Sequence, residues 1–327
     1  MSKQNKPRKQ HYVPQYYLRN FHSKKKFKGY KNNGEPKYEY WIYFYDKTTK
    51  ITKEVEVECV GQKKYFYDIP ESLLLHILVI NPKIIEKIIE KAYLEKDFWL
   101  NYDKRASILL KEILQKLEKK HSCNKGVDEI DNIIDYQDKE KIIILMVMQL
   151  IRTPKFRDKI TDISGAIAQR KELWTTGEKQ LDYLIEKILK AILDAPQYLH
   201  AKNYICNLER IEEIYCSLKE RPFFIGINTS NKPLITSDSP VVFANEEEGF
   251  NEIQLSGEGL EISFPISSKF IAITIDNNDN YPYLMGNNIK GISLGLEEIT
   301  KFNKLQLLQS VSQVYSNENF DWLHDSV

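Results

Sequence analysis

Residues 11–21 read HYVPQYYLRNF and place a histidine, an arginine and four aromatic residues directly behind a lysine-rich start. Pro14 suits the first turn of a helix, where its missing N–H is not needed, so His11 is expected just outside the helix N-terminus. Gln15, Arg19 and His22 then fall at i, i+4 and i+7 on one face. The opposite face is aromatic and apolar: Tyr17, Leu18 and Phe21. The segment predicts a short amphipathic helix, whose apolar face packs on the body of the protein and whose polar face is free to contact a site.

Outward from this helix, strand-like and helix-like sequence are segregated. Residues 38–68 alternate and are rich in β-branched and aromatic residues, which predicts a hairpin region. Residues 82–218 have helical periodicity, and within them the polar stretch 119–138 is expected to be an exposed excursion. Strand signals return over 220–276, and a last helix is expected over 295–315. This order predicts an α+β fold with a small N-terminal β-hairpin region, a central helical bundle and a C-terminal antiparallel β-sheet closed by a C-terminal helix.

Length and charge indicate a globular protein with a basic end. The chain has 327 residues, of which 42% are hydrophobic and 28% charged, enough for a substantial core. The net charge is +1, yet residues 1–40 hold eleven lysines and arginines against two glutamates. We expect residues 1–10 to be a flexible basic tail and residues 11–327 to form a single domain. Such a basic block is either a solvated tail or the footprint of a polyanion partner such as RNA.

The cysteines and the apolar runs indicate in which cellular compartment the protein is expected. The four cysteines show no Cys-x-x-Cys spacing, so reduced thiols in a cytosol are the simple interpretation. The lysine-rich start lacks the apolar core of a secretory signal. The longest apolar run, residues 142–151, is shorter than the roughly 20 residues needed to cross a bilayer. We expect a cytoplasmic protein without a membrane segment, and the oligomeric state stays open.

Three further segments accompany the opening motif: QLIRTP at 149–154, ITSDSP at 235–240 and FPIS at 264–267. Together the four segments resemble the bacterial domain-of-unknown-function 4238 family, over most of the chain. The chain departs from the family pattern at Ser239, where asparagine is common, and at Ser268, where proline is common. Neither departure removes an ionisable group. The resemblance implies a shared fold and a shared site, and it leaves the reaction open.

Two of these segments supply candidate polar groups. Gln149 and Arg152 lie three apart on the most apolar helix, and a buried guanidinium must be paired, either with a carboxylate of the fold or with a bound oxyanion. The Thr-Pro pair after Arg152 predicts a helix break, with Arg157 exposed beyond it. Asp238 lies in a turn between two short strands, where an aspartate can serve the turn alone. Alternatively it shares a cleft with His11 and Arg152, where it orients the imidazole or binds a metal.

Missing motifs argue against several classes of enzyme. The chain contains no P-loop, Gly-x-Gly-x-x-Gly or Gly-x-Ser-x-Gly sequence, which argues against nucleotide-driven motors, dinucleotide enzymes and α/β-hydrolases. The histidines lack zinc-binding spacings. We therefore expect no cofactor, with a divalent metal at Asp238 left open.

Two hypotheses of different classes follow. The first is a metal-independent nuclease or phosphodiesterase, RNA favoured, with a defence or toxin-type role, in which His11 acts as general acid/base and Arg19 with Arg152 binds phosphate. It requires His11, Arg152 and Asp238 to converge on one cavity. The second is a non-catalytic module that docks nucleic acid or protein through its basic aromatic N-terminal arm. The predicted catalytic residues are His11, Asp238 and Arg152; the predicted substrate-binding residues are Arg19, Gln149, Tyr17, Thr236 and Ser237.

Overall fold

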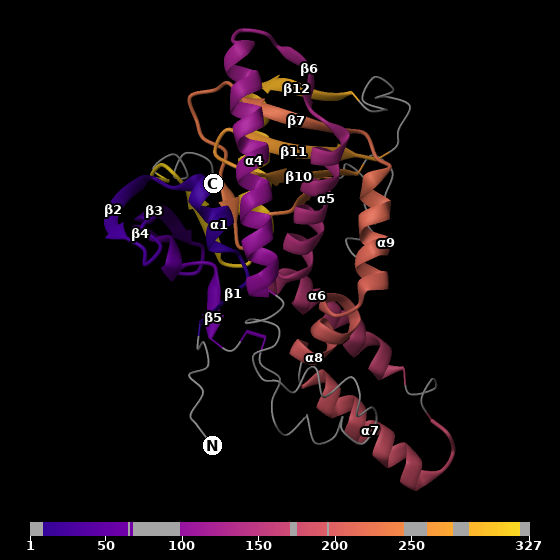
Figure 1. Ribbon diagram of the computed structural model, residues 1–327. Helices are drawn as coiled ribbons and strands as arrows, with labels where there is room; N and C mark the ends of the chain where they lie inside the picture. Colours follow the sequence, from indigo (N-terminus) through magenta and orange to yellow (C-terminus); the bar gives the residue numbers. More distant parts are fainter. Residues whose placement is uncertain are drawn as a thin grey trace.

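The computed structural model of the protein describes residues 9–64, 66–67, 99–170, 175–194, 196–244, 260–276 and 288–320. Within these ranges, helices and three sheets form a mixed α+β arrangement (Figure 1), which confirms the predicted fold class. Residues 1–8 of the predicted tail lie outside the described residues, whereas Lys9 and Gln10 belong to a strand. None of the helices in the described ranges is long and apolar enough to span a membrane.

The helix predicted from Pro14 is present and short. Strand β1 (Lys9–His11) leads into α1 (Gln15–Leu18), which continues as one 3-10 turn over Arg19–Phe21. Pro14 has extended dihedrals and stands immediately before α1, as its fixed φ favours. Strand β1 pairs antiparallel with β5 (Gln62–Lys64), and this two-stranded sheet fixes the chain in front of α1.

The N-terminal sheet begins earlier than the predicted hairpin region. Its strands are β2 (Lys24–Tyr30), β3 (Pro36–Asp46) and β4 (Ile51–Glu56), and all three pair antiparallel around β3. The sequence of β2 is KKKFKGY. Neither face of this strand is fully buried, so its sequence lacks the alternation of apolar and polar residues that predicts a strand. The same sheet takes up β13 (Gln313–Ser316) and β8 (Thr236–Ser237) from the far end of the chain.

The helical part follows the expected order along the chain. Asp135 caps the longest apolar helix and Thr153 caps the next one through its Oγ1, so the predicted helix break at Thr153 and Pro154 is confirmed. The described helices of this part are α4 (Leu100–Cys123), α5 (Tyr136–Ile151), α6 (Pro154–Gln169), α7 (Lys179–Leu193), α8 (Pro196–His200), a π-helical turn (Ala201–Ile205) and α9 (Leu208–Lys219).

The largest sheet has six strands in the order β6-β12-β7-β11-β10-β9, and α4 crosses one of its faces (Figure 1). Neighbouring strands are antiparallel except β7 and β12, which are parallel, so the predicted antiparallel C-terminal sheet is a mixed sheet. The strands are β6 (Glu129–Ile134), β7 (Phe223–Asn228), β9 (Val242–Ala244), β10 (Glu261–Pro265), β11 (Phe270–Ile275) and β12 (Ile289–Leu294).

Three local expectations were wrong. The excursion expected over 119–138 contains β6, because its isoleucines are buried against the sheet. The final helix expected over 295–315 ends at Gln309 as α10 (Leu296–Gln309), because residues 313–316 pair instead with β3 and β8 as β13. Arg157, expected to be exposed, is only 6% exposed, and its guanidinium carbon lies 3.5 Å from the centroid of the Phe66 ring.

Candidate functional site

Tyr17 anchors α1 to the body of the protein. Its ring is 1% exposed and stacks on Phe264, with the ring centroids 5.1 Å apart and the planes within 9°. Its hydroxyl donates to the carbonyl of Pro265 at 2.5 Å and lies 2.8 Å from Oγ1 of Thr236. Burial raises the pKa of Tyr17, so the hydroxyl stays protonated and can donate. Three of the sequence motifs therefore meet at one buried side chain.

Arg152 closes the end of α5 and holds the strand that carries His11. It is 1% exposed, donates from one terminal nitrogen to Oδ1 of Asp103 at 2.8 Å, and donates from the other to the carbonyl of His11 at 2.8 Å. Its guanidinium carbon lies 4.1 Å from the ring centroid of Trp99. Burial lowers the pKa of Arg152, but Asp103, Tyr67 and Tyr16 together raise it, and the net shift is upward. The carboxylate that pairs with this guanidinium is thus one from α4.

Gln149 binds the backbone of Tyr12, the residue that follows His11. Its amide nitrogen donates to the carbonyl of Tyr12 at 3.1 Å, and the side chain is buried. Gln149 and Arg152 thus share a face, as their spacing predicts, and hold two consecutive backbone carbonyls. A carbonyl buried without a donor is costly, so these two bonds fix the path of the chain into α1.

Asp238 binds the backbone of residues 311–313. Its carboxylate accepts from the backbone N–H groups of Val311, Ser312 and Gln313 at 2.8, 2.7 and 2.9 Å, and from Oγ of Ser312 at 3.1 Å. Burial raises the pKa of Asp238, while these donors favour the carboxylate. Within the described ranges, no hydrogen bond or ion pair joins Asp238 to His11.

Ser237, the neighbour of Asp238, also points inward. It is fully buried and donates from Oγ to Oε1 of Gln306 on α10 at 2.8 Å. Thr236, likewise buried, faces Tyr17. Most of the predicted site residues therefore lie in the interior as a hydrogen-bonded support: Tyr17, Gln149, Arg152, Thr236, Ser237 and Asp238.

His11, Gln15 and Arg19 form the face of this support that reaches solvent. Arg19 donates to Oε1 of Gln15 at 3.2 Å, which turns Nε2 of Gln15 toward Nε2 of His11, 3.4 Å away. Nε2 of His11 also lies 3.3 Å from the carbonyl of Glu58. The first contact requires an unprotonated Nε2 and the second a protonated one, so the two contacts select different tautomers. Burial lowers the pKa of His11, which favours the neutral ring at neutral pH.

The contacts among His11, Gln15 and Arg19 continue onto the neighbouring hairpin of β2 and β3. The guanidinium carbon of Arg19 lies 5.3 Å from the ring centroid of Tyr40 on β3, and the ring of His22 meets the same tyrosine edge-on at 5.3 Å. Lys25 on β2 pairs opposite Tyr40 and places its Nζ 3.8 Å from the ring centroid of Tyr38. The basic side chains of α1 and β2 thus alternate with tyrosine rings of β3.

At the far end of the hairpin the rings are exposed. Phe27 is 57% exposed, Tyr30 72% and Tyr38 38%. The ring of Phe27 lies 5.9 Å from that of Tyr38 and 5.3 Å from that of Tyr30, so the three form one cluster. We call the whole surface the aromatic-basic strip: Arg19, His22, Lys25, Phe27, Tyr30, Tyr38 and Tyr40.

Sequence reasoning missed two parts of this arrangement. Asp103, the partner of Arg152, has no distinguishing pattern around it, because an aspartate in the first turn of a helix is common. The hairpin cluster did have a signal, since aromatic residues interrupt the lysines of residues 24–30. The sequence predicts a basic aromatic arm at this end of the chain, but not the strand β2 that clusters these rings.

The described side chains include no group of three or more histidine, cysteine, aspartate or glutamate residues placed to hold a metal ion. Asp238 in particular directs both carboxylate oxygens at donors from residues 311–313.

Comparison with known proteins adds the family. Neither the curated proteins nor the solved structures include a significant match to this chain. The model of one family, described as protein of unknown function (DUF4238), matches residues 9–320, a range that includes all four motif segments, and the chain therefore belongs to this family.

Proposed function

We propose that the protein binds single-stranded nucleic acid, with RNA favoured, along the aromatic-basic strip. The observation that carries the proposal is the cluster of Phe27, Tyr30 and Tyr38, three large rings exposed together beside basic side chains. Unpaired bases stack on exposed rings and contribute about 1–3 kcal/mol each. Bases in a duplex already stack on one another, so the strip suits a single strand.

The charges of the strip support the same proposal. In the described part of the chain, Arg19 and Lys25 have no carboxylate partner, so both can contact phosphates. Lys24, the neighbour of Lys25 on the opposite face of the hairpin, forms an ion pair with Glu54 instead. Arg19 and Lys25 are therefore two cations available to phosphate on the side that carries the exposed rings.

The free thiols agree with RNA as the partner. All four cysteines are free and exposed: Cys59, Cys123, Cys206 and Cys216. A reducing cytoplasm, where single-stranded RNA is abundant, maintains that state. The cytoplasmic location is part of this proposal.

Fluorescence anisotropy with a labelled oligouridylate and a labelled duplex of equal length tests the proposal. We expect wild-type protein to prefer the single strand, and the variant F27A/Y30A/Y38A to lose about a hundredfold or more in affinity, since three stacked bases are removed. The three rings are exposed, so the variant should unfold at the wild-type temperature. Equal affinity of wild type and variant for the single strand would refute the proposal.

A second candidate is a metal-independent phosphodiesterase, with His11 as general acid/base and Arg19 binding phosphate. It is favoured by the position of a neutral, half-buried imidazole beside Gln15 and Arg19, at the end of the strip. The catalytic set of His11, Arg152 and Asp238 stays a prediction. A defence or toxin-type role would follow from such cleavage.

Labelled RNA incubated with wild type and with His11→Ala, each with EDTA, separates the two candidates. His11→Ala keeps the backbone carbonyl that Arg152 binds, so the variant should fold. Cleavage by wild type alone supports the phosphodiesterase, and binding without cleavage by either protein leaves the binding function.

A further inference from the structure

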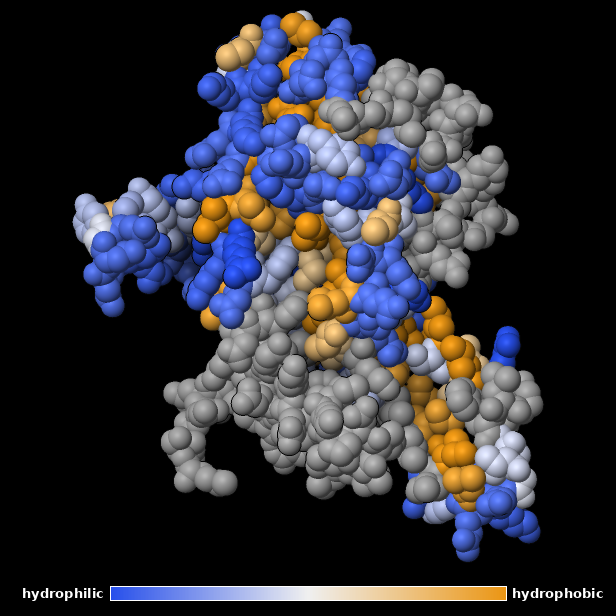
Figure 2. Space-filling model, turned by 45° about the vertical axis from the view of Figure 1, so that its right-hand side comes forward, coloured by the Kyte–Doolittle hydropathy of each residue, from blue (hydrophilic) through white to orange (hydrophobic). Residues whose placement is uncertain are grey.

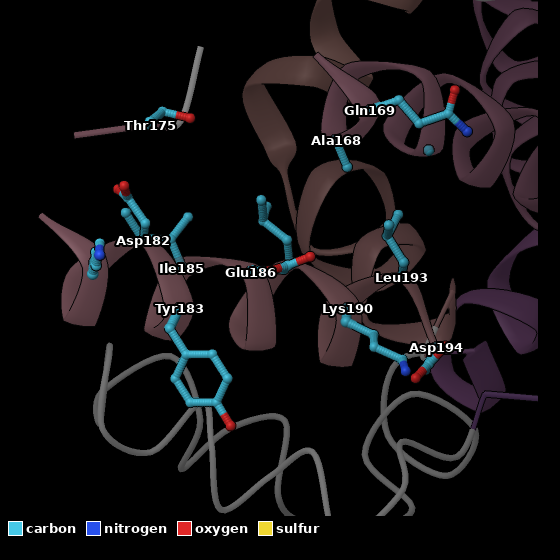
Figure 3. A pocket seen from close by; sticks show the side chains of 13 residues that line it. Ala168, Gln169, Thr175, Asp182, Tyr183, Ile185, Glu186, Lys190, Leu193 and Asp194 are labelled. Carbon is cyan, nitrogen blue, oxygen red and sulfur yellow. The ribbon is translucent and has the colours of Figure 1, made fainter. Parts of the chain in front are cut away.

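A second surface lies on the helical arm formed by α6 and α7, away from the aromatic-basic strip. A groove of about 650 Å³ runs between the two helices (Figure 3). Gly165 and Ala168 line it from α6, and Ile185, Leu189 and Leu193 line it from α7. A Cβ added at Gly165 would meet no atom within 4 Å, so the hollow exists because the α6 side chains are small there.

Further apolar side chains are exposed on the same two helices. Ile163 and Ile167 on α6 are 43% and 45% exposed, and Leu181 and Tyr183 on α7 are 40% and 59% exposed. Figure 2 shows the resulting apolar band along the arm. Each square ångström of such surface removed from water contributes about 25 cal/mol, so covering the band is favourable.

The charges of α7 indicate which partner covers this apolar band. Lys179 begins the helix and Asp194 follows its end. Asp182 and Lys190 lie about one turn inside (Figure 3). At the centre, Glu186 is followed by Lys187. A second α7 running antiparallel pairs Lys179 with Asp194 and Glu186 with Lys187. It also brings Asp182 within one residue of Lys190, so opposite charges lie near one another.

We infer that the arm is an interface between two copies of this chain, with the α7 helices antiparallel across a two-fold axis near Glu186 and Lys187. In this arrangement Lys179 faces Asp194 of the partner subunit, and Asp182 lies near Lys190 of the partner subunit. Tyr183 of each copy lies against the groove of the other, beside Leu189 of the partner subunit. The inference does not depend on the proposed function, because the strip lies on other elements.

Sedimentation velocity over a range of protein concentrations tests the interface. Wild type should associate to a dimer as concentration rises. Ala168→Trp fills the groove and should give a monomer with an unchanged circular dichroism spectrum. Lys304→Glu on α10, which makes the same charge change as Lys179→Glu but lies on another element, should dimerise as wild type does.

A charge swap tests the antiparallel arrangement itself. Lys179→Glu alone or Asp194→Lys alone places like charges together and should weaken dimerisation, although each change favours the dipole of its own helix and cannot be explained by unfolding. The double variant K179E/D194K restores both pairs and should restore the dimer. A wild type that is monomeric at every concentration, or a dimer that neither Ala168→Trp nor the single charge variants weaken, would overturn the inference.

Discussion

A terminal nitrogen of Arg152 lies 2.8 Å from the backbone oxygen of His11, so a buried cation at the end of α5 fixes the residue that begins the exposed face of α1. The same guanidinium pairs with Asp103 on α4. One side chain thus connects two long helices to the N-terminal segment. The exposed face rests on this interior support, and exposed and supporting residues can be mutated separately.

Arg152→Ala is expected to destabilise the fold by about 3 kcal/mol, because it removes one partner of a buried ion pair and leaves the His11 carbonyl without its donor. The low end of the usual range applies, since the Asp103 side chain is 25% exposed. Urea unfolding of the variant measures the loss. Arg19→Ala is the control, and its exposed side chain should change stability by less than about 0.5 kcal/mol. Equal stability of the two variants would contradict the supporting role of Arg152.

Tyr17→Phe should cost about 1–3 kcal/mol, because it leaves the carbonyl of Pro265 without a donor while the stacking on Phe264 stays. Thermal and urea unfolding measure the change. Tyr30→Phe makes the same chemical change at an exposed ring and should leave stability as it is. If both substitutions were neutral, the hydroxyl of Tyr17 would not hold α1 in place.

His200 predicts a dependence of stability on pH. It is fully buried, with Nε2 at the carbonyl of Ile151 and Nδ1 accepting from Nε of Arg157 at 3.2 Å. Burial, and then the charge of Arg157, lowers the pKa of His200 to about 3. Between that value and the ordinary pKa near 6.5 the unfolded chain binds a proton that the folded chain does not.

The stability that His200 contributes is therefore complete above pH 6.5 and is lost as pH falls, by up to about 1.4 kcal/mol per pH unit. We expect His200→Gln, which cannot be protonated there, to flatten the pH dependence of urea unfolding between pH 4 and 6.5. His121→Gln is the comparison: burial lowers the pKa of this half-buried histidine less than that of His200, so the pH dependence should flatten less. An unchanged slope in His200→Gln would show that other groups govern acid unfolding.

Lys25 and Lys24 predict different salt dependences of RNA binding. Lys25 lies on the face of the exposed rings, and Lys24 pairs with Glu54 on the other face. Lys25→Ala should therefore reduce the slope of log affinity against log salt by about 0.7, the value for one phosphate contact with a single strand. Lys24→Ala should leave the slope unchanged. Titrations at several salt concentrations measure both, and identical slopes for the two variants would place the bound strand elsewhere.

Local features of this protein can be predicted from its sequence alone. The 3.6-residue period separates the buried Tyr17 from the exposed Arg19 on α1, and Thr153 with Pro154 ends one helix and begins the next. Segregated strand and helix signals likewise predicted the α+β class. These features follow from residues a few positions apart, whose geometry the backbone alone sets.

Which polar groups reach solvent depends on contacts between residues far apart in the chain. Arg152 meets Asp103, 49 positions away, and Asp238 binds N–H groups 73 to 75 positions away. The same is true of β13, which leaves the helical pattern to pair with β3. A hydrogen-bond partner far along the chain leaves no mark on local periodicity, because it is fixed by the path of the folded chain and the exclusion of water around it.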